Sequence, residues 1–116
     1  MKRWGLVLLL CLPLILAFSV EQLDKGDVVN DLADILPTSQ EAVLEEYIIS
    51  IEQNQSVEFA VVTVKTIENQ DIFQASLQAA EYLGVGKQDV DNGLLIFIAV
   101  EDREYFIQVG KGLEGS

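Results

Sequence analysis

Histidine is absent from the 116-residue sequence, and Cys11 is its only cysteine. Beyond residue 11 the chain therefore has neither imidazole nor thiol ligands for a zinc, copper or iron site. It also lacks the residues of a Ser-His-Asp or Cys-His catalytic system, and one cysteine cannot form an internal disulfide. A metal site in this chain must use oxygen ligands, which favour Ca²⁺ or Mg²⁺. Zinc, iron and haem are not expected as cofactors.

Basic residues are also few: seven Lys and Arg stand against nineteen Asp and Glu, a formal net charge of −12. After residue 19, five basic and nineteen acidic residues remain, which gives −14. Binding to nucleic acid or to anionic lipid depends mainly on Lys and Arg. We therefore expect no nucleic-acid partner, and the surface suits solubility and cation binding.

The N-terminus has the three parts of an export signal. Lys2 and Arg3 supply the positive charge, Leu6 to Leu16 is apolar apart from Pro13, and Ala17-Phe18-Ser19 offers small residues at the −3 and −1 positions of a cleavage site. Residues 1–19 are thus predicted to be a signal peptide. The alternative is an uncleaved membrane anchor through residues 4–20, a stretch close to the ~17–25 residues that span a bilayer. Either way, the acidic remainder is expected outside the cytoplasm, secreted, periplasmic or at the cell surface.

Residues 20–37 are mixed and polar and are interpreted as an extended lead-in. Thr38 to Glu41 fits a capping box, which predicts a helix start with Thr38 as its N-cap. The helix has one apolar stripe, and the run 53–56 ends it. The stripe consists of Leu44, Tyr47, Ile48 and Ile51. Phe59 to Val64 is a short, β-branched apolar run, which indicates a strand covered on both faces.

A second helix is predicted from Gln70 to Leu83, with Gly84 as its left-handed C-cap. Phe73, Leu77 and Ala80 form its main stripe, widened by Ile72, Ala79 and Leu83. A buried strand follows at 94–100, and after a polar turn the alternation at 105–109 indicates a strand antiparallel to it. The fold class is α/β, a mixed sheet made of a βαβ unit and an antiparallel hairpin with helices packed on it. The domain spans 38–116 and is expected to be incomplete, because nothing after Ser116 covers the sheet edge.

Several segments, in order, resemble the TPM domain family over most of residues 28–116. Asn30-Asp31-Leu32-Ala33 after Val29 is similar to the opening motif, and Leu83-Gly84-Val85-Gly86 stands where members often have Trp-Gly-Ile-Gly. The strongest stretches are 91–99, Asp102-Arg103, and Gly110 to Gly115. The resemblance implies an α/β/α sandwich, divalent-cation binding in some members, and a phosphatase label that does not extend to every member. The family domain continues past Gly-Leu-Glu-Gly, so a site that needs that continuation is incomplete here.

Two glycine motifs do not indicate nucleotide binding. Gly110, Gly112 and Gly115 match the dinucleotide fingerprint in spacing, but they follow the return strand of a hairpin instead of opening a βαβ unit. Gly84 to Lys87 resembles the end of a P-loop, but Glu81 and Gln88 occupy positions that the motif reserves for Gly and for Ser or Thr. No nucleotide cofactor is expected. Asn54 begins an Asn-Gln-Ser glycosylation sequon, a pattern that is common by chance.

The candidate metal ligands are Asp91, Asp102 and Glu114. Asp91 precedes one strand and Glu114 follows its antiparallel neighbour, so these two are expected at one sheet edge. Asp102 is expected at the opposite edge with Thr66, where the parallel strands end and where ligands of open α/β sheets bind. Ordinary turn roles remain open: Asp91-Asn92-Gly93 makes a turn, and Asp102 has the alternatives of pairing with Arg103 or capping the hairpin. No catalytic residue can be named.

The sequence therefore predicts an extracytoplasmic, divalent-cation-binding accessory module for a membrane or envelope protein complex. One alternative is a metal-assisted acid phosphatase, although phosphate sites normally recruit Arg or Lys. The other is a purely structural assembly domain.

Overall fold

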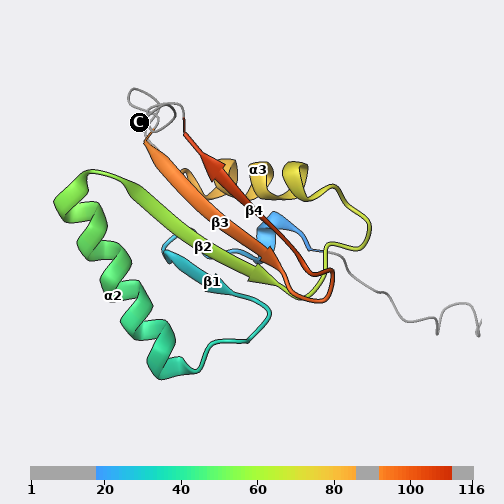
Figure 1. Ribbon diagram of the computed structural model, residues 1–116, viewed down its shortest axis with the longest axis horizontal. Helices are drawn as coiled ribbons and strands as arrows, with labels where there is room; N and C mark the ends of the chain where they lie inside the picture. The colour runs from blue at the N-terminus through green and yellow to red at the C-terminus, as the bar shows by residue number, and fades with distance from the viewer. Residues whose placement is uncertain (1–17, 86–91, 111–116) are drawn as a thin grey trace, which may run out of the picture.

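A four-stranded mixed sheet forms the centre of the protein in a computed structural model, which describes residues 18–85 and 92–110 (Figure 1). The strand order is β1-β2-β3-β4, with β1, β2 and β3 parallel and β4 antiparallel to β3. The described elements are η1 (Val20–Gln22), β1 (Val29–Asp31), α2 (Thr38–Gln55), β2 (Glu58–Val64), α3 (Ile72–Leu83), β3 (Gly93–Ala99) and β4 (Glu104–Val109). The βαβ unit and the antiparallel hairpin are confirmed.

The two helices lie on opposite faces of the sheet, because successive side chains of a strand point to opposite sides. On β2, Ala60, Val62 and Val64 join the cluster that α3 covers, whereas Val61 joins the cluster around α2. Figure 1 shows α3 behind β3 and β4, and α2 at the left, beside β1 and β2. The fold is thus an α/β/α sandwich, in agreement with the sequence.

Residues 29–31, which the sequence analysis places in the lead-in, form a fourth strand. Val29, Asn30 and Asp31 pair in parallel with Val61, Val62 and Thr63. The periodicity predicted three strands because a three-residue strand carries almost no pattern. Val29 is 1% exposed, so β1 belongs to the folded core.

The core on the α3 side is the larger of the two. Val62, Leu95 and Phe97 of the central strands are fully enclosed, and the small residues Ala75 and Ala79 let α3 approach them closely. Burial of each large apolar side chain contributes about 1.5–3 kcal/mol. The predicted stripe of α3 is partly confirmed, because Ala79 is buried in this cluster and Ile72, Ala80 and Leu83 pack against it. Phe73 is 42% exposed, however, and Ala75 and Ser76, which lie outside the predicted stripe, are buried.

The core on the α2 side is narrow. Ile48 is the one residue of α2 that is buried, against Val29 and Val61, and Leu44 packs beside it. Tyr47, predicted to face the core, is 65% exposed. α2 packs against β1 and β2, at one side of the sheet, and its contribution to this core centres on Ile48 and Leu44.

Both helix starts differ from the prediction. Pro37 is the N-cap of α2 and its carbonyl accepts from the N–H groups of Gln40 and Glu41, both at 2.9 Å, while no side chain caps the helix. Thr38 is the first helical residue, so the predicted capping box is wrong. In α3, the Asp71 carboxylate accepts from the Gln74 N–H at 3.0 Å and sets the start two residues later than expected. Gly84 ends α3 at φ 69°, as predicted.

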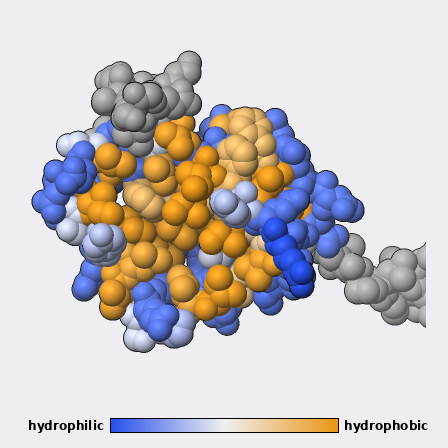
Figure 2. Space-filling model, viewed as in Figure 1, coloured by the Kyte–Doolittle hydropathy of each residue, from blue (hydrophilic) through white to orange (hydrophobic). Residues whose placement is uncertain are grey.

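One face of the β3–β4 hairpin is apolar and open. Leu94, Ile96 and Ile98 of β3 pair with Val109, Ile107 and Tyr105 of β4, and we call these six residues the open apolar face. Its β4 members are 38%, 43% and 69% exposed in that order. A shallow hollow of about 480 Å³ crosses the Ile96, Ile98, Tyr105 and Ile107 part of it. Figure 2 shows apolar residues gathered over the centre of this side of the molecule.

Candidate functional site

Two carboxylates stand at the edge where the parallel strands end. Asp31 is the last residue of β1, and Asp102 lies in the turn between β3 and β4. Thr63 and Thr66, at and just beyond the end of β2, are the hydroxyl partners of these two acids. The predicted meeting of Asp102 and Thr66 is confirmed, whereas the pairing of Asp31 with Thr63 was not predicted.

The Asp102 carboxylate ties the loop after β2 to the hairpin turn. Its Oδ2 accepts from the Ile67 N–H at 2.8 Å, and both oxygens lie 3.1 Å from the Thr66 hydroxyl that donates to them. The same hydroxyl accepts from the Glu68 N–H at 3.0 Å. Asp102 thus binds the 66–68 loop, and neither of the two turn roles left open from the sequence describes this contact.

Asp31 organises the loop that leads into α2. Its two carboxylate oxygens accept from the N–H groups of Ile35, at 3.2 Å, and Leu36, at 2.8 Å, and from the Thr63 hydroxyl. Thr63 is 2% exposed, and its oxygen also accepts from the Ala33 N–H at 3.2 Å. Burial by itself raises the pKa of Asp31, but the hydrogen bonds from Thr63, Leu36, Ile35 and Asp34 together hold that pKa below its usual value. Asp31 is therefore a charged anchor of the fold.

A polar hollow of about 500 Å³ lies beside Asp102. It is lined by Ile67, Asn69, Gln70, Asp71, Ile72, Asp102 and Glu104, and we call it the acidic hollow. Oxygen ligands of this kind suit Ca²⁺ or Mg²⁺. Within residues 18–85 and 92–110, however, no three carboxylates converge closely enough to form a metal site. Asp71 and Glu104 were missed by the sequence analysis, although an Asp before a helical stripe is itself an N-cap signal.

Asp91 and Glu114, the other two predicted ligands, lie outside the described residues, as do Gly86, Lys87, Gly112 and Gly115. Residues next to Asp91 and Glu114 in the sequence show how that edge of the sheet is built. Asn92 donates to the Ser56 carbonyl and accepts from the Glu58 N–H, and Gly110 donates to Gly93 at 2.8 Å. The starts of β2 and β3 and the end of β4 therefore meet at one edge, as predicted.

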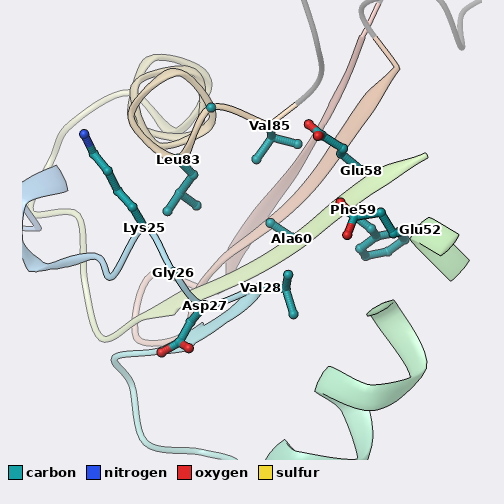
Figure 3. A pocket seen from close by; sticks show the side chains of 11 residues that line it. Lys25, Gly26, Asp27, Val28, Glu52, Glu58, Phe59, Ala60, Leu83 and Val85 are labelled. Carbon is teal, nitrogen blue, oxygen red and sulfur yellow. The ribbon is translucent and has the colours of Figure 1, made fainter. Parts of the chain in front are cut away.

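A small pocket of about 150 Å³ opens near the same edge, between α3, β2 and the segment 25–28. In Figure 3 the charged groups of Lys25, Asp27 and Glu58 are spread around it and do not point to a common centre. The Lys25 ammonium lies 4.4 Å from the centre of the Tyr82 ring, a cation–π contact that holds the segment against α3. In the part of the chain that the structure describes, no helix is long and apolar enough to span a bilayer.

Comparisons with known proteins agree with the geometry. The family model described as TPM domain matches residues 29–116. The solved N-terminal domain of a P. gingivalis protein is 30% identical with a TM-score of 0.77, and the match covers 87% of this chain and 68% of that one. The N-terminal domain of a Corynebacterium glutamicum protein is 21% identical with a TM-score of 0.64, and the match covers 87% of this chain and 65% of that one. At this identity the likeness supports the fold alone. No curated protein matches.

Proposed function

This chain belongs to the TPM domain family, and from that premise we propose that it is an extracytoplasmic, divalent-cation-binding accessory module of a membrane or envelope protein complex. Its family alone does not fix its function. The proposal combines the N-terminal export pattern, the acidic surface and the distribution of apolar residues over the sheet.

The observation that carries the accessory role is the open apolar face. Tyr105 and Ile107 are 69% and 43% exposed, and Ile96 and Ile98 lie beside them on the adjacent strand. Contiguous apolar surface of this kind favours contact with another protein surface over contact with water. Arg103 and Glu104 border the hollow in this face and supply a polar rim. Such a surface serves binding and supplies no chemistry.

Cation binding is supported by ligand type. Every hard ligand in the acidic hollow is an oxygen, and Asp71, Asp102 and Glu104 contribute carboxylates to its wall. Asp71 and Asp102 already accept hydrogen bonds from backbone N–H groups, so each has only part of its lone-pair capacity left. A cation there would complete its shell with water or with further oxygen ligands. Asp91 and Glu114 remain candidates for a separate site at the other edge.

An acid phosphatase is the enzymatic alternative, and the acidic hollow does not favour it. Phosphoryl transfer needs positive groups that bind phosphate oxygens. The residues that line the hollow are acidic, amide or apolar, and Arg103 borders the open apolar face instead. A structural assembly domain, the third candidate, would use the open apolar face and respond to no cation.

Thermal unfolding of the full chain with and without millimolar Ca²⁺ or Mg²⁺ tests the proposal. A cation that binds only the folded state at a hundred times its dissociation constant adds about 2.7 kcal/mol of stability. We expect this gain in the wild type and in Glu46→Gln, a control on the exposed part of α2, and a smaller gain in Glu104→Gln. If a folded sample shows no gain, the purely structural role is favoured. Hydrolysis of a phosphate monoester by the wild type that is lost in a folded Asp102→Ala variant would establish the enzyme.

A further inference from the structure

Phe18, the first residue that the structure describes, is part of the hydrophobic core. Its side chain is 8% exposed and packs with Val62, Val64 and Phe97 in the cluster on the α3 side. The rings of Phe18 and Phe97 meet edge to face, with centroids 5.4 Å apart and planes at 70°. Phe97 is 0% exposed, so Phe18 covers a fully enclosed aromatic ring of the core.

The backbone around Phe18 is also fixed to the domain. Its carbonyl accepts from Gln70 Nε2 at 3.2 Å, which joins the segment to the loop before α3. Ser19 follows directly and begins η1, since its carbonyl accepts from the Gln22 N–H at 3.0 Å. Leu23, after η1, is 5% exposed and lies in the same cluster. Folded structure therefore begins no later than residue 18.

This position conflicts with cleavage after Ser19. Ala17 and Ser19 have the small side chains that such a cut requires, but it would remove Phe18 from the mature chain. The space beside Phe97 would then be empty, and Gln70 would lose its partner. Cleavage after Ala17 also places a small residue at −1, with Ile15 at −3, and keeps Phe18 in the domain.

It also conflicts with an uncleaved anchor. A span from Trp4 to Val20 would need Phe18 in the bilayer, whereas Phe18 packs against Phe97. Without residues 18–20, the apolar stretch from Trp4 to Ala17 has fourteen residues. About 20 residues are needed to span a bilayer, and a stretch of about 10–14 suits the apolar part of a cleaved signal.

We propose that a leader peptidase cleaves this chain between Ala17 and Phe18, so that Phe18 is the first residue of the mature protein. The proposal rests on the export proposed above. Water adds across the peptide bond: Ala17 takes the new carboxylate and leaves with the leader, and Phe18 keeps the new α-amino group. The cut thus keeps Phe18, with its core contacts, in the mature chain.

The test is the N-terminus of the exported protein. The full chain, with its own first nineteen residues, is expressed in a bacterial host, and envelope and cytoplasmic fractions are analysed by intact mass and N-terminal sequencing. We expect a chain that begins Phe-Ser-Val-Glu in the envelope fraction. A chain beginning at Val20, or an exported chain that retains Met1, would overturn the cleavage site. A precursor confined to the cytoplasm would overturn export as well, and the fractions distinguish these outcomes.

Three variants sharpen the test. Ser19→Leu puts a bulky residue at −1 for the cut after Ser19 but at +2 for the cut after Ala17, so we expect processing to continue unchanged; a block would overturn the proposal. Phe18→Ala, compared with Ser19→Ala, probes the core directly. We expect Phe18→Ala to lower the midpoint of thermal unfolding by about 10–20 °C and Ser19→Ala by only a few degrees. Equal midpoints for the two variants would remove the structural basis of the proposal.

Discussion

At the scale of single residues, Asp31 is the most informative side chain, because its charge is used by the loop that connects β1 to α2. It accepts from the Leu36 N–H at 2.8 Å and from the Ile35 N–H at 3.2 Å. In Asp31→Asn one of the two acceptors becomes an NH₂ group, which opposes an N–H donor. We expect a loss of about 1–3 kcal/mol in unfolding free energy at neutral pH, measured by urea denaturation.

The contribution of Asp31 to the free energy of unfolding depends on pH with a definite sign. Hydrogen bonds lower the pKa of Asp31 against the effect of its burial, so the folded state favours the carboxylate. A lowered pKa gives stability that is present above the unfolded value, near 3.9, and is lost as pH falls through the folded value. The stability difference between wild type and Asp31→Asn should therefore shrink below about pH 4. Asp34→Asn, an exposed change in the same loop, is the control, and a constant difference across that range would contradict this account.

The sequence indicated which acidic residues lie at this edge of the sheet better than it indicated their hydrogen-bond partners. Asp102 and Thr66 were expected at one edge because each follows a strand, and they form a hydrogen bond. Asp31 belongs to a motif that carried the family resemblance, yet its bond to Thr63, thirty-two positions away, depends on the pairing of β1 with β2. Since β1 has only three residues, no periodicity in the sequence indicated it.

At the scale of elements, α3 ends at Gly84, whose backbone adopts the left-handed conformation. Gly84 has a φ of 69°, and its N–H is bonded to the carbonyls of Ala80 and Glu81. No heavy atom lies within 4 Å of the place where a Cβ would stand, so space does not limit a substitution. We expect Gly84→Ala to cost about 1 kcal/mol because an L-residue is disfavoured at positive φ.

Gly84→Asn separates this conformational cost from other effects. Asn adopts the left-handed region more readily than Ala, so its cost in unfolding free energy should be smaller. Urea denaturation of the three proteins under one condition gives the comparison. An Asn variant less stable than the Ala variant would mean that something other than φ limits this position.

Two glutamates of helix α2, Glu41 and Glu45, repel each other. Glu41 and Glu45 stand four residues apart on one side of the helix, and burial together with the charges of Asp27 and Glu41 raises the pKa of Glu45. Glu45→Lys replaces this repulsion with a favourable Glu-to-Lys pair, for an expected gain of about 0.5 kcal/mol or more. Glu46→Lys changes the net charge equally but has no charged residue three or four positions away, and we expect a smaller gain in the same denaturation assay.

The elements themselves were predictable, and their buried faces were less so. Apolar runs located β2 and β3, and Gly84 located the end of α3. The stripe on α3 was only partly right because large residues such as Phe73 weigh most in a periodicity, whereas Ala75 and Ser76, outside the predicted stripe, are buried together with the predicted Ala79. Ser76 is 0% exposed, and its hydroxyl donates to the Phe73 carbonyl and accepts from Gln108, both at 3.0 Å. A buried serine of this kind has no signal in hydropathy.

At the scale of the whole molecule, alternating hydropathy predicted that β4 returns antiparallel, but not which of its faces would be covered. Phe106 and Gln108 turn toward α3, where Phe106 stacks edge to face on Phe73 at 5.3 Å. Tyr105 and Ile107 turn to the other side, where α2 packs against β1 and β2 instead. The covered face of β4 carries Glu104, Phe106 and Gln108, and the open face carries Tyr105, Ile107 and Val109. Hydropathy alone therefore does not identify the covered face, which depends on where the helices dock.

This asymmetry gives a prediction with a built-in control. Phe106→Lys and Ile107→Lys make the same change of charge on adjacent residues of one strand, on opposite faces of the sheet. Phe106→Lys removes an aromatic pair and a half-buried ring, and we expect it to lower the unfolding free energy by about 2 kcal/mol or more. Ile107 is 43% exposed, so Ile107→Lys should cost about 1 kcal/mol or less and should reduce any self-association seen by sedimentation. Equal losses would mean that the open apolar face is packed in the intact protein.

A partner that binds the wild type and Phe73→Ala but not Ile107→Lys would identify this face as the contact through which the accessory role operates.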